Sequence, residues 1–305
     1  MTETIPAPFF REIVGFSGKL AVIDDRACAS PLGGNKARKL LGGLLGEARA
    51  HGAKRLFTCG AYGSHHVLAT AVHGARAGFE VHAALWPQPE TEHVRAVREA
   101  GLAAGLVAHH VHSTTTLRSA ARTLAIARDP KTFFIPLGGS TPRSLEAHAA
   151  ATRALVARHP TLAGLDAIVV PFGSGGTALG IALGLAQALG DRGPRVHAVV
   201  VSAPAFGSTA LAAQLLARAV AGGLVGAGTA RQAWRRLVPD ARFVGAGYGH
   251  TTRPAEEALG FARAAGFELE VTYTAKAFAA ALTLVRAGER AAYWATLGAT
   301  DQRPR

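Results

Sequence analysis

The sequence predicts an α/β protein built from two open, mostly parallel sheets flanked by helices. Three observations favour this fold class: a length of 305 residues, a composition that is 49% apolar, and a regular alternation of short apolar runs with helical patterns from residue 54 onward. Strands that alternate with helices form parallel sheets, because right-handed crossovers place each helix against a face of the sheet. Eight predicted strands are more than one nucleotide-binding half of a doubly wound sheet usually contains, so we expect two sheets and two domains.

The predicted strands are short runs of apolar, β-branched and aromatic residues. In chain order they cover residues 55–59, 81–86, 106–111, 132–136, 166–172, 195–202, 269–273 and 291–296. Between them apolar residues recur with helical spacing. The predicted helices cover 65–77, 91–103, 115–128, 143–158, 176–189, 207–221, 228–237, 253–265 and 275–287. A further helix is expected from Lys36 through Arg49.

Composition narrows the classes of protein that fit. The formal charge is +13, but the basic residues are scattered along the chain, so we expect no nucleic-acid partner. No apolar run reaches the roughly 18–20 residues of a membrane span. The N-terminus does not have the pattern of a signal peptide, and two cysteines, Cys28 and Cys59, indicate a reducing compartment. We therefore expect a cytoplasmic protein without a membrane partner.

The first candidate site residue is a lysine in a glycine-rich segment. Only six of the 33 basic residues are lysines, and Lys36 and Lys39 lie three apart in PLGGNKARKL, residues 31–40. Residues at this spacing share one face of a helix. One amine could attack an aldehyde while the other pairs with a phosphate. Taken alone, such a pair more often indicates two surface lysines beside a turn.

A second candidate is the glycine-rich turn at 173–177, which follows a predicted strand and opens a helix. Its backbone N–H groups, two hydroxyls and helix N-terminus favour a phosphate site. The spacing also fits a dinucleotide fingerprint, but the next strand ends at 201–204 without the expected carboxylate. A cofactor with a single phosphate fits better. The residues assigned to this site are Gly173, Ser174, Gly175, Gly176 and Thr177.

Three further segments contribute single candidates. Ser64 begins a predicted helix, where its hydroxyl and free N–H groups could bind a carboxylate or simply cap the helix. Histidines at 65–66 and 109–112 lack a spacing that brings them together with a carboxylate or thiolate, so no metal site is expected. Tyr273 and Thr296 end predicted strands, where a phenol ring could stack on a cofactor ring and a hydroxyl could meet a ring nitrogen.

In chain order, these segments resemble the family of D-cysteine desulfhydrase and 1-aminocyclopropane-1-carboxylate deaminase, which has the two-domain fold type II of pyridoxal-phosphate enzymes, as in the tryptophan synthase β chain. The resemblance extends from about residue 20 to 299. It depends most on GGNK at 33–36, GSHH at 63–66, GSGGT at 173–177 and YTAKA at 273–277.

The resemblance implies a role for each candidate. Lys36 would hold pyridoxal 5'-phosphate covalently, with Lys39 near the phosphate. His65, in place of the family's asparagine, would face the ring oxygen, Tyr273 would lie beside the ring, and Thr296 would meet the pyridine nitrogen. Ser64 would be the hydroxyl on the substrate side.

The resemblance also implies an organisation and an activity. The larger, cofactor-binding domain would comprise residues 1–45 and 145–305, the smaller one 46–144, and the protein would be a homodimer. The expected reaction is β-elimination from a small amino acid such as D-cysteine, giving pyruvate and ammonia, with Lys36, Ser64 and Tyr273 as catalytic residues. Cyclopropane ring opening, β-replacement, and a diverged cofactor- or dinucleotide-binding role remain open, because departures from the family pattern fall mainly on the substrate side.

Overall fold

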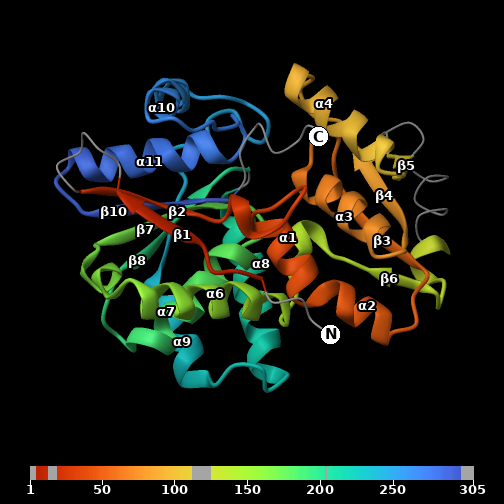
Figure 1. Cartoon of the computed structure of the whole chain (residues 1–305), viewed down its shortest axis with the longest axis horizontal. Coiled ribbons are helices and arrows are strands. Elements are labelled where there is room, and N and C mark those ends of the chain that lie inside the picture. The colour runs from red at the N-terminus through yellow and green to blue at the C-terminus, as the bar shows by residue number, and fades with distance from the viewer. Residues whose placement is uncertain (1–4, 13–18, 112–124, 203–204, 297–305) are drawn as a thin grey trace.

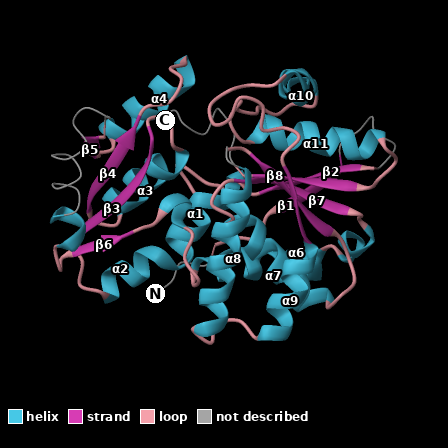
Figure 2. Cartoon of the chain, turned by 180° about the vertical axis from the view of Figure 1, so that it is seen from behind, coloured by secondary structure: helices cyan, strands magenta, loops and turns pink. Residues whose placement is uncertain are grey.

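The computed structural model describes residues 5–12, 19–111, 125–202 and 205–296. They form two sheets, of six and four strands, each flanked by helices (Figures 1 and 2). All strand pairs are parallel except the pair at the edge of the larger sheet. The predicted fold class is confirmed.

The larger sheet has the strand order β1-β2-β10-β7-β8-β9. These strands are β1 (Phe9–Glu12), β2 (Leu20–Asp24), β7 (Ala167–Phe172), β8 (Arg195–Val200), β9 (Leu237–Asp240) and β10 (Ala291–Ala295). Helices that cover one face are α6 (Ser144–Arg158), α7 (Gly176–Leu189), α8 (Ala205–Ala221) and α9 (Ala227–Arg236). The other face is covered by α10 (Arg253–Ala264) and α11 (Thr274–Arg286). The two faces bury two separate apolar clusters.

The smaller sheet has the order β5-β4-β3-β6 and its own apolar core. Its strands are β3 (Arg55–Ala61), β4 (Glu80–Trp86), β5 (Val107–His110) and β6 (Thr132–Phe134). The associated helices are α2 (Leu45–Ala50), α3 (His65–Arg76) and α4 (Glu92–Ala103), and α1 (Asn35–Lys39) lies between the two sheets (Figure 1). All four strands fall between residues 55 and 134. The division into domains at residues 45 and 145 stays a prediction.

The structure corrects several elements. The prediction of a strand at 269–273 is wrong: these residues form a turn that leads into α11, because Glu270 caps the helix. Strands β1, β2 and β9 were not predicted. The helix expected from Lys36 through Arg49 is interrupted by one π-helical segment, Leu40–Leu44. Most of the helix predicted at 115–128 lies outside the described residues. Within the described residues, no helix is long and apolar enough to cross a membrane.

Candidate active site

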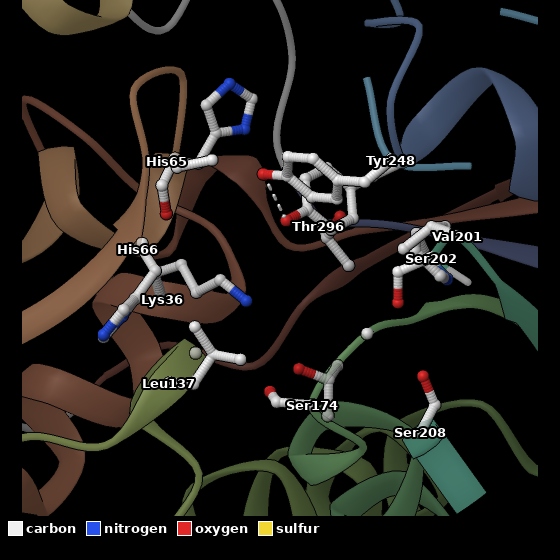
Figure 3. A pocket seen from close by; sticks show the side chains of 18 of the residues that line it. Lys36, His65, His66, Leu137, Ser174, Val201, Ser202, Ser208, Tyr248 and Thr296 are labelled. Atoms are coloured by element: carbon white, nitrogen blue, oxygen red, sulfur yellow. Dashed lines mark hydrogen bonds between the residues drawn. The ribbon is translucent and has the colours of Figure 1, made fainter. Parts of the chain in front are cut away.

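A cavity of about 460 Å³ opens where strands of both sheets end at their carboxyl edges. Residues that follow β3, β7 and β10 line it, as do residues of α1 and α8. In open parallel sheets this edge is the usual position of a ligand, because helix N-termini and flexible turns meet there. Figure 3 shows the Lys36 amine directed toward the middle of this pocket.

Lys36 is held in the cavity by the residue that precedes it. The backbone N–H of Asn35 donates to the Thr296 carbonyl (3.1 Å), and the Asn35 side-chain amide donates to Thr177 Oγ1 (3.0 Å). Lys36 itself is half-buried, and within the described residues its amine has no hydrogen-bond partner. Burial lowers the pKa of Lys36 to about 8, so the free amine is far more populated near neutral pH than it is for an ordinary lysine.

A buried ion pair lies beneath this segment. Arg38 donates to Asp25 Oδ1 through Nη2 (2.5 Å) and Nε (2.9 Å), and both side chains are fully or almost fully buried. The Asp25 carbonyl accepts a hydrogen bond from the backbone of Gly34 (3.1 Å), two residues before Lys36. Trp294 Nε1 lies 3.4 Å from the second Asp25 oxygen. The pair therefore fixes the loop that presents the lysine.

The turn after β7 forms an anion cup, Gly173–Thr177. Gly175 has φ of +83°, and α7 begins at the next residue, so backbone N–H groups of the first turn of a 14-residue helix face the cavity edge. Ser174 Oγ is 2.8 Å from Ser140 Oγ. A Cβ on Gly138 would lie 2.2 Å from Ser174 Oγ, so only glycine lets the two turns approach. The donors and the space fit one phosphate group.

Lys39 lies behind the cup rather than on the cavity wall. Its ammonium donates to the Gly138 carbonyl (3.0 Å) and to Ser140 Oγ (3.1 Å), and 1% of the residue is exposed. A Cβ on Gly176 would lie 2.9 Å from Lys39 Nζ. Burial, and then the nearby Lys36, lower the pKa of Lys39 well below its usual value. Any effect of Lys39 on a bound phosphate would thus pass through Ser140 and the start of α7.

Ser64 and the two histidines after it form the wall contributed by the smaller sheet. Ser64 is the N-cap of α3, with Oγ accepting from the backbone N–H of Val67 (3.4 Å). His65 Nε2 is 2.9 Å from His93 Nε2, which places a half-buried imidazole of α4 behind the cavity wall. Burial lowers the pKa of His65 and of His66 well below the usual value, so both are neutral. Among the described residues, no three metal-binding side chains gather at one point.

The opposite wall is a pair of tyrosines anchored by a buried glutamate. Tyr273 donates to the Tyr248 hydroxyl (2.9 Å), and their rings meet edge to face. The Glu270 carboxylate accepts from the backbone N–H groups of Thr272, Tyr273 and Thr274 at 2.7–2.8 Å. Burial raises the pKa of Tyr248 to about 12 and raises that of Tyr273 well above its usual value, so both phenols keep their protons. Tyr273 thus precedes a helix, not a strand end as expected.

Most sequence candidates line this one cavity. The lining includes Lys36, Ser64, His65, Gly173, Ser174, Gly175, Thr177, Tyr273 and Thr296, whereas Lys39 and Gly176 lie behind it. Sequence reasoning did not single out Asn35 as a tether, Tyr248, Glu270, Ser202 or Ser208. In Figure 3 the hydroxyls of Ser202 and Ser208 point into the pocket beside the turn that carries Ser174. The position of Ser202 after β8 is the signal that could have identified it.

The chain is similar to two curated proteins over half of its length. It is 38% identical over 165 residues to nocardicin C-9' epimerase of Nocardia uniformis subsp. tsuyamanensis, covering 52% of this chain and 50% of the epimerase. It is 31% identical over 167 residues to D-cysteine desulfhydrase of Salmonella typhi, covering 52% of this chain and 51% of the desulfhydrase. The chain thus matches about half the length of either relative.

Solved structures resemble the whole fold. A homologue of ACC deaminase superposes with a TM-score of 0.79 at 23% identity, covering 99% of this chain and 92% of the homologue. A fungal L-serine ammonia-lyase from Rhizomucor miehei superposes with a TM-score of 0.68 at 15% identity, covering 96% of this chain and 94% of the ammonia-lyase. At these identities the likeness shows the fold.

A family-level match covers almost the entire chain. The sequence profile described as "Pyridoxal-phosphate dependent enzyme" matches residues 4–293, which include every motif around the cavity except Thr296. The cofactor prediction is confirmed by this match. The chain belongs to the family of pyridoxal-phosphate dependent enzymes, and pyridoxal phosphate is its cofactor.

Proposed function

We propose that the protein catalyses β-elimination from a small amino acid, as D-cysteine desulfhydrase does, giving pyruvate and ammonia. The proposal depends on one observation: the amine of Lys36 lines a cavity beside an anion cup, has no partner among the described residues, and has a pKa lowered to about 8. When bound, pyridoxal phosphate withdraws electrons from the substrate's Cα and so makes its proton removable.

Lys36 is the proposed base for that proton. A general base works best when its pKa lies near the working pH, and burial moves the Lys36 pKa from its ordinary value toward that range. The Arg38–Asp25 pair beneath the loop and the Asn35 tether restrict the position of the Nζ atom. Lys36 would therefore hold the cofactor, and its free amine would be placed to take the Cα proton.

The other groups orient the substrate and supply protons. Ser64 and the free N–H groups at the start of α3 are donors for the substrate carboxylate. Because Tyr273 donates its hydrogen to Tyr248, the Tyr248 hydroxyl keeps its own hydrogen available for the leaving group. Thr296 is buried and lines the cavity, and a neutral hydroxyl is its proposed contribution at the ring nitrogen. That contact would limit charge delocalisation and favour prompt loss of the β substituent.

Two measurements test this function. Purified protein incubated with pyridoxal phosphate should develop a visible absorption band that Lys36→Ala loses and Lys54→Ala, a change at an exposed lysine, retains. The loaded protein should release pyruvate from D-cysteine faster than 2-oxobutyrate from the cyclopropane amino acid. A band that persists in Lys36→Ala would contradict the role of Lys36. Absence of pyruvate would contradict the elimination.

Epimerisation at Cα is a second candidate, because the relative with 38% identity is named an epimerase. Both reactions begin with removal of the Cα proton, and they differ in the step after it. Return of a proton from the opposite face inverts the centre, whereas loss of a β substituent gives pyruvate. Chiral chromatography of D- and L-amino acids after incubation, together with the pyruvate assay, separates the two reactions.

A further inference from the structure

The last residue of β4 and the three residues that follow it form a mostly apolar edge of the cavity. Trp86, Pro87, Gln88 and Pro89, here called the rim segment, all line the cavity, and Trp86 is 38% exposed. A large aromatic side chain that is left partly exposed beside a cavity commonly marks a binding surface. The two prolines restrict the backbone, so little conformational entropy is lost when a ligand packs against the segment.

Contacts on both sides hold the rim segment in place. Gln88 Oε1 accepts from the backbone N–H of Gly63 (3.0 Å), in the turn just before Ser64. At its other end, a Cβ on Gly249 would lie 3.2 Å from Pro89 Cδ, and Gly249 follows Tyr248. The rim segment thus bridges the turn that carries Ser64 and the loop that carries Tyr248, on the side of the cavity assigned to the substrate.

The loop that carries Tyr248 and Gly249 is anchored by Lys276. Lys276 Nζ donates to the carbonyls of Val244 (2.8 Å) and Gly247 (2.9 Å). These bonds hold the segment that places Tyr248 and Gly249 against the rim segment. The recess between Trp86 and Tyr248 is therefore preformed, as binding sites for apolar groups usually are.

The cavity offers no partner for a charged substrate side chain. Among the described residues that line it, Lys36 and Glu270 are the ionic side chains, since His65 and His66 are neutral. Lys36 is assigned to the cofactor, and the Glu270 carboxylate already accepts three backbone N–H bonds. A charged group placed at the rim segment would lose its hydration without compensation.

We propose that the preferred substrate is larger than D-cysteine: its β leaving group carries an aromatic or similarly bulky apolar portion that packs against Trp86 and Pro89, so that loss of this group still gives pyruvate. The inference rests on the proposed function, because it assumes that an amino acid binds between Ser64 and Tyr248. It makes Trp86 a specificity-determining residue. A small substrate such as D-cysteine would leave the rim segment uncovered.

Exchange of the Cα hydrogen in deuterium oxide tests this directly. Alanine and phenylalanine have no β leaving group, so proton NMR of the loaded enzyme with each enantiomer reports only the first chemical step. We expect phenylalanine to exchange with a kcat/KM at least about tenfold above that of alanine. Trp86→Ala should reduce this ratio to within about threefold. Trp234→Ala, at a tryptophan of α9 that is 36% exposed and does not line the cavity, should leave the ratio unchanged.

A binding measurement keeps the two proposals distinguishable. Calorimetry should show that 3-phenylpropionate binds the loaded enzyme more tightly than propionate, and that Trp86→Ala removes the difference. If alanine exchanges as fast as phenylalanine, the inference is overturned while the proposed function stands. If neither exchanges, the proposed function fails, and the calorimetric comparison alone decides the role of Trp86. If Trp86→Ala instead converts a dimer to a monomer in size-exclusion chromatography, the rim segment is a subunit interface and the inference is wrong.

Discussion

Replacing Arg38 by methionine is expected to destabilise the protein in a pH-dependent way. Arg38 pairs with the fully buried Asp25, whose carbonyl binds Gly34 in the loop before Lys36. Methionine keeps most of the volume but leaves the carboxylate with a 3.4 Å contact to Trp294 Nε1 and with the buried His148 Nε2 at 4.0 Å, whose pKa burial lowers well below its usual value. Burial raises the pKa of Asp25 and Arg38 offsets part of that rise, so loss of Arg38 raises this pKa further.

The free energy of unfolding that Arg38→Met loses has an upper limit, because the Asp25 carboxyl can bind a proton instead of staying charged. Keeping an aspartate neutral at pH 7 costs about 1.4 kcal/mol for each of the roughly three pH units above its unfolded pKa, or about 4 kcal/mol. At pH 5.5 the same reasoning gives about 2 kcal/mol. Because the folded-state pKa lies above the unfolded one, the defect grows as the pH rises above about 4 and levels off above the folded-state pKa.

Thermal unfolding followed by circular dichroism at the two pH values measures this defect. Since 1 kcal/mol shifts Tm by about 2–4 °C in large domains, Arg38→Met should melt up to about 8–16 °C below the parent at pH 7 and about half as far below at pH 5.5. The double variant Asp25→Asn, Arg38→Met removes the buried charge and should recover most of the loss. A single variant that loses less than about 3 °C, or equally at both pH values, would refute the reasoning.

Three further outcomes are expected. Gly175→Ala should destabilise the protein by about 1–3 kcal/mol and weaken pyridoxal-phosphate binding in titrations, because φ is +83° and the added Cβ would lie 2.8 Å from that of Ala212. The rate of cofactor incorporation into apoprotein, followed by absorbance, should rise with pH through about 8 as Lys36 loses its proton; a midpoint near the usual lysine pKa would contradict this. Glu270→Gln should lower stability in urea by about 1 kcal/mol, because a neutral amide caps α11 less well; unchanged stability would argue against the cap.

The fold was largely predictable because helical periodicity is strong in this chain. Helix α7 was predicted at its observed bounds, and α3 and α6 within one residue, although α7 is buried at every position from 176 to 186 and so has no polar face there. Strand β9 was missed because its four residues continue directly from a helix. The alternation in 269–273 resembles a strand, but the Glu270 side chain bonds the backbone locally, and no periodicity argument can anticipate that competition.

The residues that line the cavity were predictable only where a glycine or a polar side chain directly follows a predicted strand. The turn at 173–177 and Ser64 were found because glycine and serine stand directly after apolar runs. Trp86 ends a strand too, yet its contribution depends on the contacts of Gln88 with Gly63 and of Pro89 with Gly249, which bring together residues far apart in the chain. The position of Lys39 behind the cup, rather than in it, likewise follows from the packing of α1 against the turn before α6.

Asn35 joins the start of α1 to the end of β10 and to the first turn of α7. Lys36, the proposed anchor of the cofactor, and the turn at 173–177, the proposed phosphate site, are consequently tied to each other. Ser64, His65 and the rim segment belong to the other sheet. We therefore expect small displacements of Ser64 and His65 to leave the cofactor seated, so that substrates can enter and products leave without its loss.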